Sequence, residues 1–210
     1  MSGITLSSLD LAALLCSRVC HDLISPAGAI VNGLEVLEEA KDEETRQFAL
    51  DLIKKSARTG SARLQFCRIA FGAAGSAGAQ IDVGDAESVA RGFIEDDKVK
   101  LDWTLPRMFL PKNRVKLLLN LLLLGGQAIP RGGTLKVESI GDGEAMGFRI
   151  TAAGLNSRVP AVQHLLDGGN EGETVDAHAI QPYYTGLLAR ECGIKVAVAA
   201  ENDSIVVTAQ

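Results

Sequence analysis

Aromatic residues are scarce in this sequence, and neither sign of charge dominates it. The 210 residues include one tryptophan and two tyrosines, and the formal net charge is −5. Nucleic-acid binding relies on a basic surface and on aromatic side chains that stack against bases. We therefore expect no nucleic-acid partner. The hydrophobic content of 47% is sufficient for a folded core.

Long apolar runs and secretion signals are also absent from the pattern. The longest apolar run, Val115 to Ile129, is interrupted by Lys116, Asn120 and Gln127. A membrane-spanning helix needs about 20 predominantly apolar residues, so we expect no membrane segment. No basic segment followed by an apolar one marks the N-terminus as a signal peptide. These features indicate a cytoplasmic protein.

The cysteines fit neither a metal site nor a disulfide framework. No Cys-x-x-Cys pair occurs, and no histidine lies at ligand spacing from both Cys16 and Cys20. We expect no bound metal and reduced thiols throughout, with Cys16 acting as a small core residue. The four cysteines are Cys16, Cys20, Cys67 and Cys192.

The first third of the chain is predicted to form a helical hairpin. Helix starts are available at Ser7, Ser8 and Asp10, and the first helix is expected to end near Ala40. A charged connection, 41–44, leads to a second helix over 45–71. Apolar and small residues recur in both helices in steps of three and four, which is typical of a bundle seam. The first seam is Leu9, Ala12, Cys16, Val19, Leu23, Pro26, Ile30, Leu34 and Leu37; the second is Ala49, Leu52, Ser56, Gly60, Leu64, Cys67 and Phe71.

One hairpin leaves the outer edges of both seams uncovered. A second copy would cover them and give a dimeric four-helix bundle, so we expect a homodimer. The alternative is that the rest of the same chain covers the seams.

His21 is the candidate reactive residue. At about 100° per residue, all the seam positions of the first helix lie within about 60° of the direction opposite His21. The imidazole should therefore face water or a partner, as a nucleophile would. Pro26 should kink the helix after the histidine. The outward face around His21, which includes the helix-weakening Gly28, is the candidate docking surface; it comprises Leu14, Ser17, Arg18, Ile24, Ser25, Gly28 and Asn32.

A Gly- and Ala-rich segment, 72–80, separates the hairpin from a region with a different sequence pattern. We divide the chain into residues 1–74 and 75–210. Strands are predicted at 81–83, 99–105, 135–140, 146–151, 195–200 and 204–208, with a turn at 141–143. Helices are predicted at 85–93, 113–124, 160–166 and 184–192. The simplest packing is a mixed sheet with helices on one face.

The run His21-Asp22-Leu23-Ile24-Ser25-Pro26 resembles the H-box of histidine kinases, in which the histidine lies on a helical hairpin that precedes an α/β domain. With Gly28-Ala29-Ile30 and Asn32-Gly33-Leu34-Glu35, the segment is still more similar to the ChpT-type histidine phosphotransferases, relatives of the kinases that have lost the kinase reaction. The resemblance covers nearly the whole chain. It implies a dimeric hairpin followed by a degenerate form of the kinase ATP-binding (Bergerat) domain.

Three nucleotide-binding boxes of the kinases are altered here. Leu124 stands where the kinases have the asparagine that helps to hold Mg²⁺, and leucine offers a hard cation no oxygen. Ala152 stands where an aspartate binds the adenine, and the phosphate-binding box is reduced to Tyr184-Thr185-Gly186-Leu187-Leu188. We therefore expect no ATP and no cofactor on this chain.

The resemblance implies a phosphoryl relay. His21 would take a phosphoryl group from a receiver-domain aspartate and pass it to another, with Asp22 orienting the imidazole and with Mg²⁺ bound by the receiver. The implied partners are a hybrid kinase of the CckA type and response regulators of the CtrA and CpdR type. Two alternatives stay open: an atypical ATP-dependent histidine kinase, and a scaffold that binds receivers without carrying phosphate. We expect His164 and His178 to be structural or surface residues.

Overall fold

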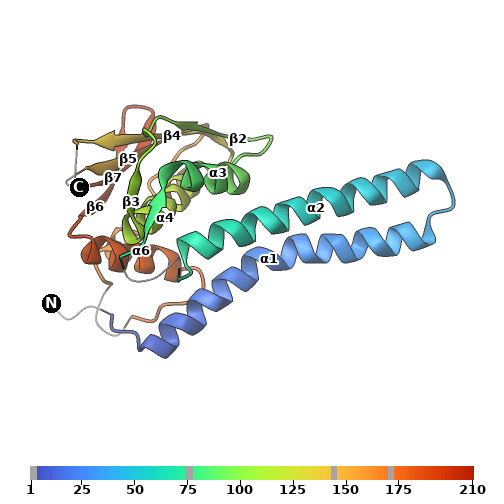
Figure 1. Cartoon of the computed structure of the whole chain (residues 1–210), viewed down its shortest axis with the longest axis horizontal. Coiled ribbons are helices and arrows are strands. Elements are labelled where there is room, and N and C mark those ends of the chain that lie inside the picture. Colours follow the sequence, from blue (N-terminus) through green and yellow to red (C-terminus); the bar gives the residue numbers. More distant parts are fainter. Residues whose placement is uncertain (1–3, 74–77, 143–145, 170–172) are drawn as a thin grey trace.

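The computed structural model describes residues 4–73, 78–142, 146–169 and 173–210. A long helical hairpin projects from one side of an α/β domain (Figure 1). The hairpin consists of α1 (Ser8–Glu39) and α2 (Glu43–Ala70), close to the predicted bounds. Both helices begin at a capping side chain: Ser7 accepts a hydrogen bond from the N–H of Asp10, and Asp42 accepts one from the N–H of Thr45.

Pro26 lies inside α1 and is buried. The helix changes direction along its middle part (Figure 1), as a proline that removes one helical hydrogen bond predicts. Two glycines let the helices approach closely. A Cβ on Gly33 would lie 2.7 Å from Ile53 Cγ1, and a Cβ on Gly60 would lie 3.7 Å from Pro26 Cβ.

The predicted seam of α1 is only partly covered in the single chain, as expected for one hairpin without a second copy. Pro26 is its one fully buried member, whereas Leu9 is 82% exposed and Leu34 is 46% exposed. Cys16, expected in the core, is also exposed. The reason is geometric: α2 covers one edge of the stripe and leaves the other edge uncovered. In α2, Leu64 is likewise 53% exposed.

By length and composition alone, α1 could cross a membrane, whereas the sequence pattern led us to expect no membrane segment. In the folded chain it packs against α2 and, near its N-terminal end, against the second region (Figure 1).

The second region contains a five-stranded mixed sheet in the order β2-β4-β5-β7-β6, in which β2 and β4 are parallel and the other neighbours antiparallel. Its strands are β2 (Val99–Trp103), β4 (Gly133–Ile140), β5 (Gly147–Ala153), β6 (Val196–Glu201) and β7 (Ser204–Ala209). A separate two-stranded sheet pairs β1 (Gln80–Asp82) with β3 (Phe109–Pro111). Its helices are α3 (Val83–Ile94), α4 (Lys112–Ala128), α5 (Gln163–Leu166) and α6 (Ile180–Glu191).

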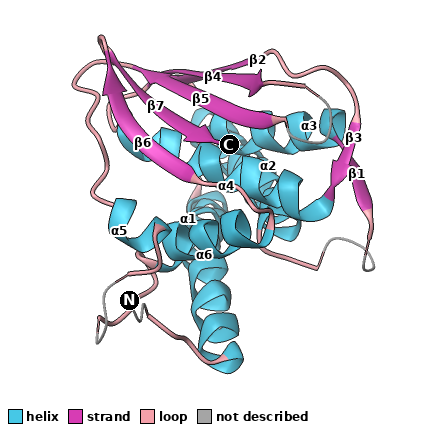
Figure 2. Cartoon of the chain, turned by 90° about the vertical axis from the view of Figure 1, so that its left-hand side faces the viewer, coloured by secondary structure: helices cyan, strands magenta, loops and turns pink. Residues whose placement is uncertain are grey.

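Helices lie against one face of the five-stranded sheet, as predicted (Figure 2). The core helix is α4, which packs on β5 and β7 and on α6. The end of α2 also enters this core: Phe66 is fully buried and stacks on Phe93 with ring centroids 4.2 Å apart. The hairpin therefore shares a core with the sheet region.

Several bounds differ from the sequence prediction; α4, for example, ends at Ala128 rather than at Leu124. Strand β3 was not predicted, α5 is shorter than expected, α6 begins at Ile180 rather than Tyr184, and β2 ends at Trp103 rather than Leu105. In the predicted linker, Gln80 already belongs to β1. Linker residues 74–77 and the third residue of the predicted turn, Gly143, lie outside the described residues.

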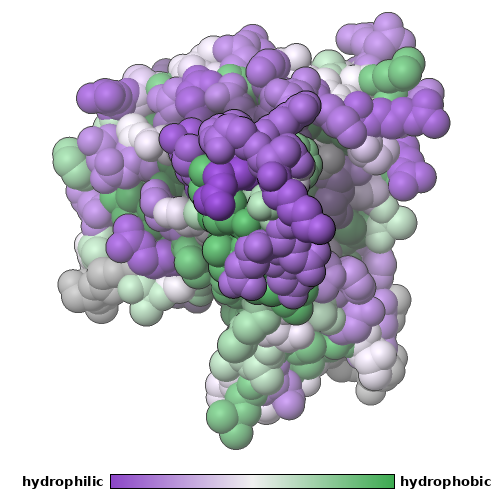
Figure 3. All heavy atoms as spheres, turned by 90° about the vertical axis from the view of Figure 1, so that its right-hand side faces the viewer, coloured by the Kyte–Doolittle hydropathy of each residue, from purple (hydrophilic) through white to green (hydrophobic). Residues whose placement is uncertain are grey.

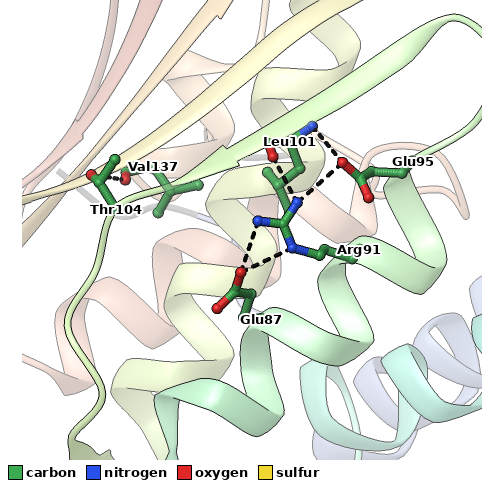
Figure 4. A network of polar contacts seen from close by, with 6 residues as sticks. All are labelled: Glu87, Arg91, Glu95, Leu101, Thr104 and Val137. Atoms are coloured by element: carbon green, nitrogen blue, oxygen red, sulfur yellow. Dashed lines mark hydrogen bonds and ion pairs between the residues drawn. The ribbon is translucent and has the colours of Figure 1, made fainter.

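A polar network fixes α3 to the edge strand β2 (Figure 4). The Arg91 guanidinium contacts Glu87 and Glu95 and donates a hydrogen bond to the carbonyl of Leu101, whose N–H donates to Glu95. Because these side chains are about one-third exposed, the contribution of each pair to stability is small. The network sets the position of β2 at the edge of the sheet, on the far side of α3 from the hairpin (Figure 4).

Candidate phosphotransfer site

The imidazole of His21 points into solvent from the middle of α1, as the helix spacing predicted. Its side chain is 66% exposed. The neighbouring Asp22 is directed toward the body of the protein, and its side chain is only 15% exposed. The two side chains therefore lie at the boundary between solvent and the packed hairpin.

The carboxylate of Asp22 faces one nitrogen of the His21 ring. Asp22 Oδ1 lies 3.9 Å from His21 Nδ1, which is beyond hydrogen-bond distance but leaves Nε2 as the nitrogen further from the carboxylate. The other carboxylate oxygen accepts a hydrogen bond from Arg18 Nε at 3.1 Å. Arg18 is thus engaged with Asp22, and its side chain is 19% exposed.

Arg63 of α2 compensates for the proline in α1. Pro26 has no N–H to donate to the carbonyl of Asp22, four residues earlier in the helix. The guanidinium of Arg63 donates a hydrogen bond to that carbonyl instead. Because a part-buried carbonyl without a partner is costly, this contact stabilises the kink and fixes α2 beside the candidate site.

Cys67 lies close to the same charged groups, but its thiol is a poor nucleophile at neutral pH. Burial, and secondarily the nearby Asp22 carboxylate, raises the pKa of its thiol to about 11. The thiol therefore stays protonated at neutral pH, and a protonated thiol is a weak nucleophile. All four cysteines are free, and Cys16 and Cys20 are exposed.

His178 lies beside His21, a proximity that the sequence analysis missed. The two ring centroids are 5.6 Å apart and the ring planes are inclined at 77°. His178 is exposed and stands in the turn before α6, which packs against α1. Neither His178 nor Arg63 carries a local spacing signal, because both reach the site through tertiary packing. His164, by contrast, pairs with Glu173 at 3.0 Å on the surface.

The expected docking residues fall into two groups. Ser17, Ile24, Ser25, Gly28 and Asn32 are exposed on the His21 face of α1. A Cβ on Gly28 would meet nothing within 4 Å, so this part of the surface is open.

Leu14 and Arg18 are half-buried instead. Leu14 packs against a small apolar cluster in the second region that includes Ile180 and Tyr183. Leu14 therefore contributes to the contact between α1 and the second region, and little of it is left for a partner.

The three altered nucleotide boxes lie in packed parts of the second region. Leu124 and Ala152 are fully buried in the main hydrophobic core. Gly186 lies inside α6, where a Cβ would come within 2.2 Å of the carbonyl oxygen of Leu166. Leu124 and Ala152 therefore fill space in the core, and Gly186 allows α6 to approach Leu166 closely.

The remaining asparagine of the first box is also structural. Asn120 is fully buried, and its side-chain amide donates to the carbonyls of Ala70 and Lys116. Its own oxygen atoms accept hydrogen bonds from Gln181, which is buried as well. The amide thus joins α4 to the end of α2 and to α6. Among the described residues, no group of three or more His, Cys, Asp or Glu side chains is placed to hold a metal ion.

Comparisons with known proteins agree with this architecture. A family model described as the histidine phosphotransferase C-terminal domain matches residues 83–204. The chain is 55% identical over 208 residues to the protein phosphotransferase ChpT of Brucella abortus (strain 2308), covering 99% of this chain and 98% of that protein. A solved structure of a bacterial phosphotransferase matches with a TM-score of 0.90 and 53% identity, covering both chains completely.

Proposed function

The chain belongs to the ChpT-type histidine phosphotransferases, and we propose that it relays a phosphoryl group between receiver domains through His21, without using ATP. The observation that carries the proposal is the exposed imidazole of His21, held on a packed helix beside a half-buried carboxylate. An accessible, largely neutral imidazole is what a phosphoryl acceptor requires near pH 7.

The chemistry follows from the two ring nitrogens. The lone pair of His21 Nε2 attacks the phosphorus of an aspartyl phosphate on the donor receiver; the N–P bond forms, and the P–O bond to the aspartate carboxylate breaks. The proton on Nδ1 stays on the ring during this step, and the Asp22 carboxylate, 3.9 Å away, stabilises the resulting positive charge. The reverse reaction with an acceptor aspartate returns the phosphoryl group. The receiver supplies Mg²⁺, so this chain needs only positioning.

We assign receiver docking to the exposed face of α1 around His21. Small residues there allow another backbone to approach, and Ile24, which is 68% exposed, offers an apolar contact. A Gly28→Trp substitution would fill this face while meeting no neighbour of its own chain. We expect it to slow phosphotransfer about tenfold or more in a quenched time course, with a melting temperature no lower than that of the wild type.

We further propose that the uncovered edge of the α1 seam pairs with a second copy. Exposed apolar residues on both helices support this, and a shallow groove between the helices is lined by Leu15, Cys16, Val19, Leu64, Cys67 and Phe71. Figure 3 views the hairpin from its tip, which is polar, and shows apolar surface below the tip. Sedimentation should show a dimer that Leu34→Glu dissociates, whereas Asn32→Glu, a matched change on the His21 face, should leave it intact.

The partners that we propose are the receiver of a CckA-type hybrid kinase and the receivers of CtrA- and CpdR-type response regulators, all in the cytoplasm. Burial of Leu124 and Ala152 supports the exclusion of ATP, since neither position has an oxygen ligand or an open space beside it.

The test mixes this protein with a phosphorylated donor receiver and an acceptor receiver, without ATP. Label should pass to the acceptor in the presence of the wild type, and transfer should stop with His21→Ala. Substitution of each cysteine serves as the matched control and should leave transfer unchanged. Labelling of His21 by ATP alone would support a kinase instead, and signalling by His21→Ala in cells would support a scaffold.

A further inference from the structure

The second region contributes an imidazole of its own to the surroundings of His21. His178 approaches it in an edge-to-face arrangement, with ring centroids 5.6 Å apart. The two residues lie at opposite ends of the sequence, and the packing of α1 beside α6 brings them together (Figure 2).

The turn that carries His178 is firmly held. The carboxylate of Asp176 accepts hydrogen bonds from the N–H groups of His178 and Ala179 at 2.9 and 2.8 Å, and these bonds lower the pKa of Asp176. Its backbone carbonyl accepts a further bond from the N–H of Ile180, which is fully buried. His178 is therefore presented by an ordered turn, on a helix whose first residue packs in the interior.

Three charged groups close to the two rings have partners among the described residues. On α1, Arg18 pairs with Asp22 at 3.1 Å; on α2, Arg63 donates to the backbone carbonyl of Asp22; in the turn, Asp176 binds two backbone N–H groups. Beside these groups, His178 adds a second imidazole, a group that carries a positive charge when it is protonated.

We propose that His178 is a second residue of the phosphotransfer site, whose protonated imidazole offsets the charge of a phosphoryl group on His21. The proposal rests on the proposed function of His21. A phosphoryl group brings close to two negative charges at neutral pH, and a cation about 4–6 Å away is favoured by such a charge. His178 forms no covalent bond in the relay; it takes up one proton from solvent and releases it when the phosphoryl group leaves.

The consequence is a pH-dependent balance between the histidine and the receiver. The protonated form of His178, which acidic pH favours, stabilises phosphorylated His21 and holds back transfer. At higher pH the neutral ring has no such effect, so transfer to the receiver is favoured. From the distance and the charges, we expect an effect on the order of fivefold on the equilibrium at low pH.

The experiment measures how label distributes at equilibrium between this protein and a CtrA-type receiver domain previously phosphorylated with acetyl phosphate. It is run at about pH 6 and about pH 8, on either side of the imidazole range, with the wild type, His178→Phe and His178→Lys. The phenylalanine keeps the ring-to-ring contact without the charge, and the lysine keeps a charge at both pH values. His164→Gln, which removes the other histidine of the second region, a residue paired with Glu173, is the matched control. The receiver contributes equally throughout, so ratios to the wild type cancel its own pH dependence.

We expect His178→Phe to hold about fivefold less label than the wild type near pH 6 and the same amount near pH 8. His178→Lys should hold more label than the wild type near pH 8, and His164→Gln should match the wild type at both. The inference is overturned if His178→Phe equals the wild type at both pH values, or is reduced equally at both, as a purely structural role predicts. Absence of label on wild-type His21 would instead overturn the proposed function.

Discussion

Two apolar helices of this protein, α1 and α4, differ sharply in burial. α1 has 32 residues, of which Pro26 and Gly33 are buried, whereas 11 of the 17 residues of α4 are buried. In the histidine kinases that the sequence resembles, the corresponding helices hold the acceptor histidine and part of the nucleotide site. Here the outer helix keeps exposed polar groups around His21, and the inner helix places leucine against the sheet. The difference supports the proposal that the phosphotransfer chemistry lies on the surface helix and that the inner helix is structural.

Replacing Leu124 of the buried helix by the asparagine of the kinases should have the largest effect on stability. Leu124→Asn removes buried apolar surface and leaves an amide without partners in the core, at a cost of about 4 kcal/mol. We expect thermal denaturation to show a decrease of about 10 °C in melting temperature. Leu123→Asn is the matched control: Leu123 is half-buried on the same helix, so its loss should be much smaller.

ATP with Mg²⁺ should not restore the melting temperature of Leu124→Asn. A ligand that binds only the folded state raises apparent stability, so recovery on adding nucleotide would show a working site in the second region. That result would contradict the contrast drawn between α1 and α4.

Substitutions at the kink in α1 should have a second, intermediate effect on the free energy of unfolding. Arg63→Met should leave the carbonyl of Asp22 without a partner and lower the free energy of unfolding by about 2 kcal/mol. In a Pro26→Ala background the helix can supply its own N–H, so the same substitution should cost less. Denaturant titration of the two single variants and the double variant measures this coupling. Equal costs of Arg63→Met in both backgrounds would show that Arg63 acts elsewhere.

The hairpin and its exposed histidine were predictable because they depend on local spacing. Caps at Ser7 and Asp42, the steps of three and four, and the break at Pro26 are properties of neighbouring residues. What covers each stripe is a property of the whole fold. The seam spacing could not show that Phe66 would pack on Phe93.

The same distinction applies to the candidate site. His21 and Asp22 are adjacent in sequence, and their motif is recognisable. Arg63 arrives from the opposite helix to satisfy a carbonyl that the proline leaves unpaired, and His178 arrives from a turn near the other end of the chain. No periodicity connects these residues to His21, so only the tertiary structure brings them together.

Substitution of the buried Lys116 on α4 should have the smallest effect on the free energy of unfolding. Burial, with the nearby Lys112 as a second cause, lowers the pKa of Lys116. The folded state therefore binds this proton less tightly than the unfolded chain, and the charged group lowers stability at neutral pH. We expect Lys116→Met to raise the free energy of unfolding by about 1 kcal/mol at pH 7.

The sign of the pH dependence sharpens this prediction. As the pH rises through the lowered pKa of Lys116 toward about 10.4, the folded state loses its proton first and the wild type regains stability. The advantage of Lys116→Met, measured by urea titration at several pH values, should therefore shrink at alkaline pH. An advantage that grows with pH would contradict the assignment.

Identification of the phosphoryl donor and the modified residue tests the central claim most directly. The protein is exposed in parallel to a receiver domain carrying labelled aspartyl phosphate and to ATP labelled in its γ-phosphate, and the labelled peptides are mapped by mass spectrometry under conditions that preserve phosphohistidine. We expect label on His21 from the receiver and none from ATP. Label transferred from ATP, or receiver-derived label on a residue other than His21, would contradict it.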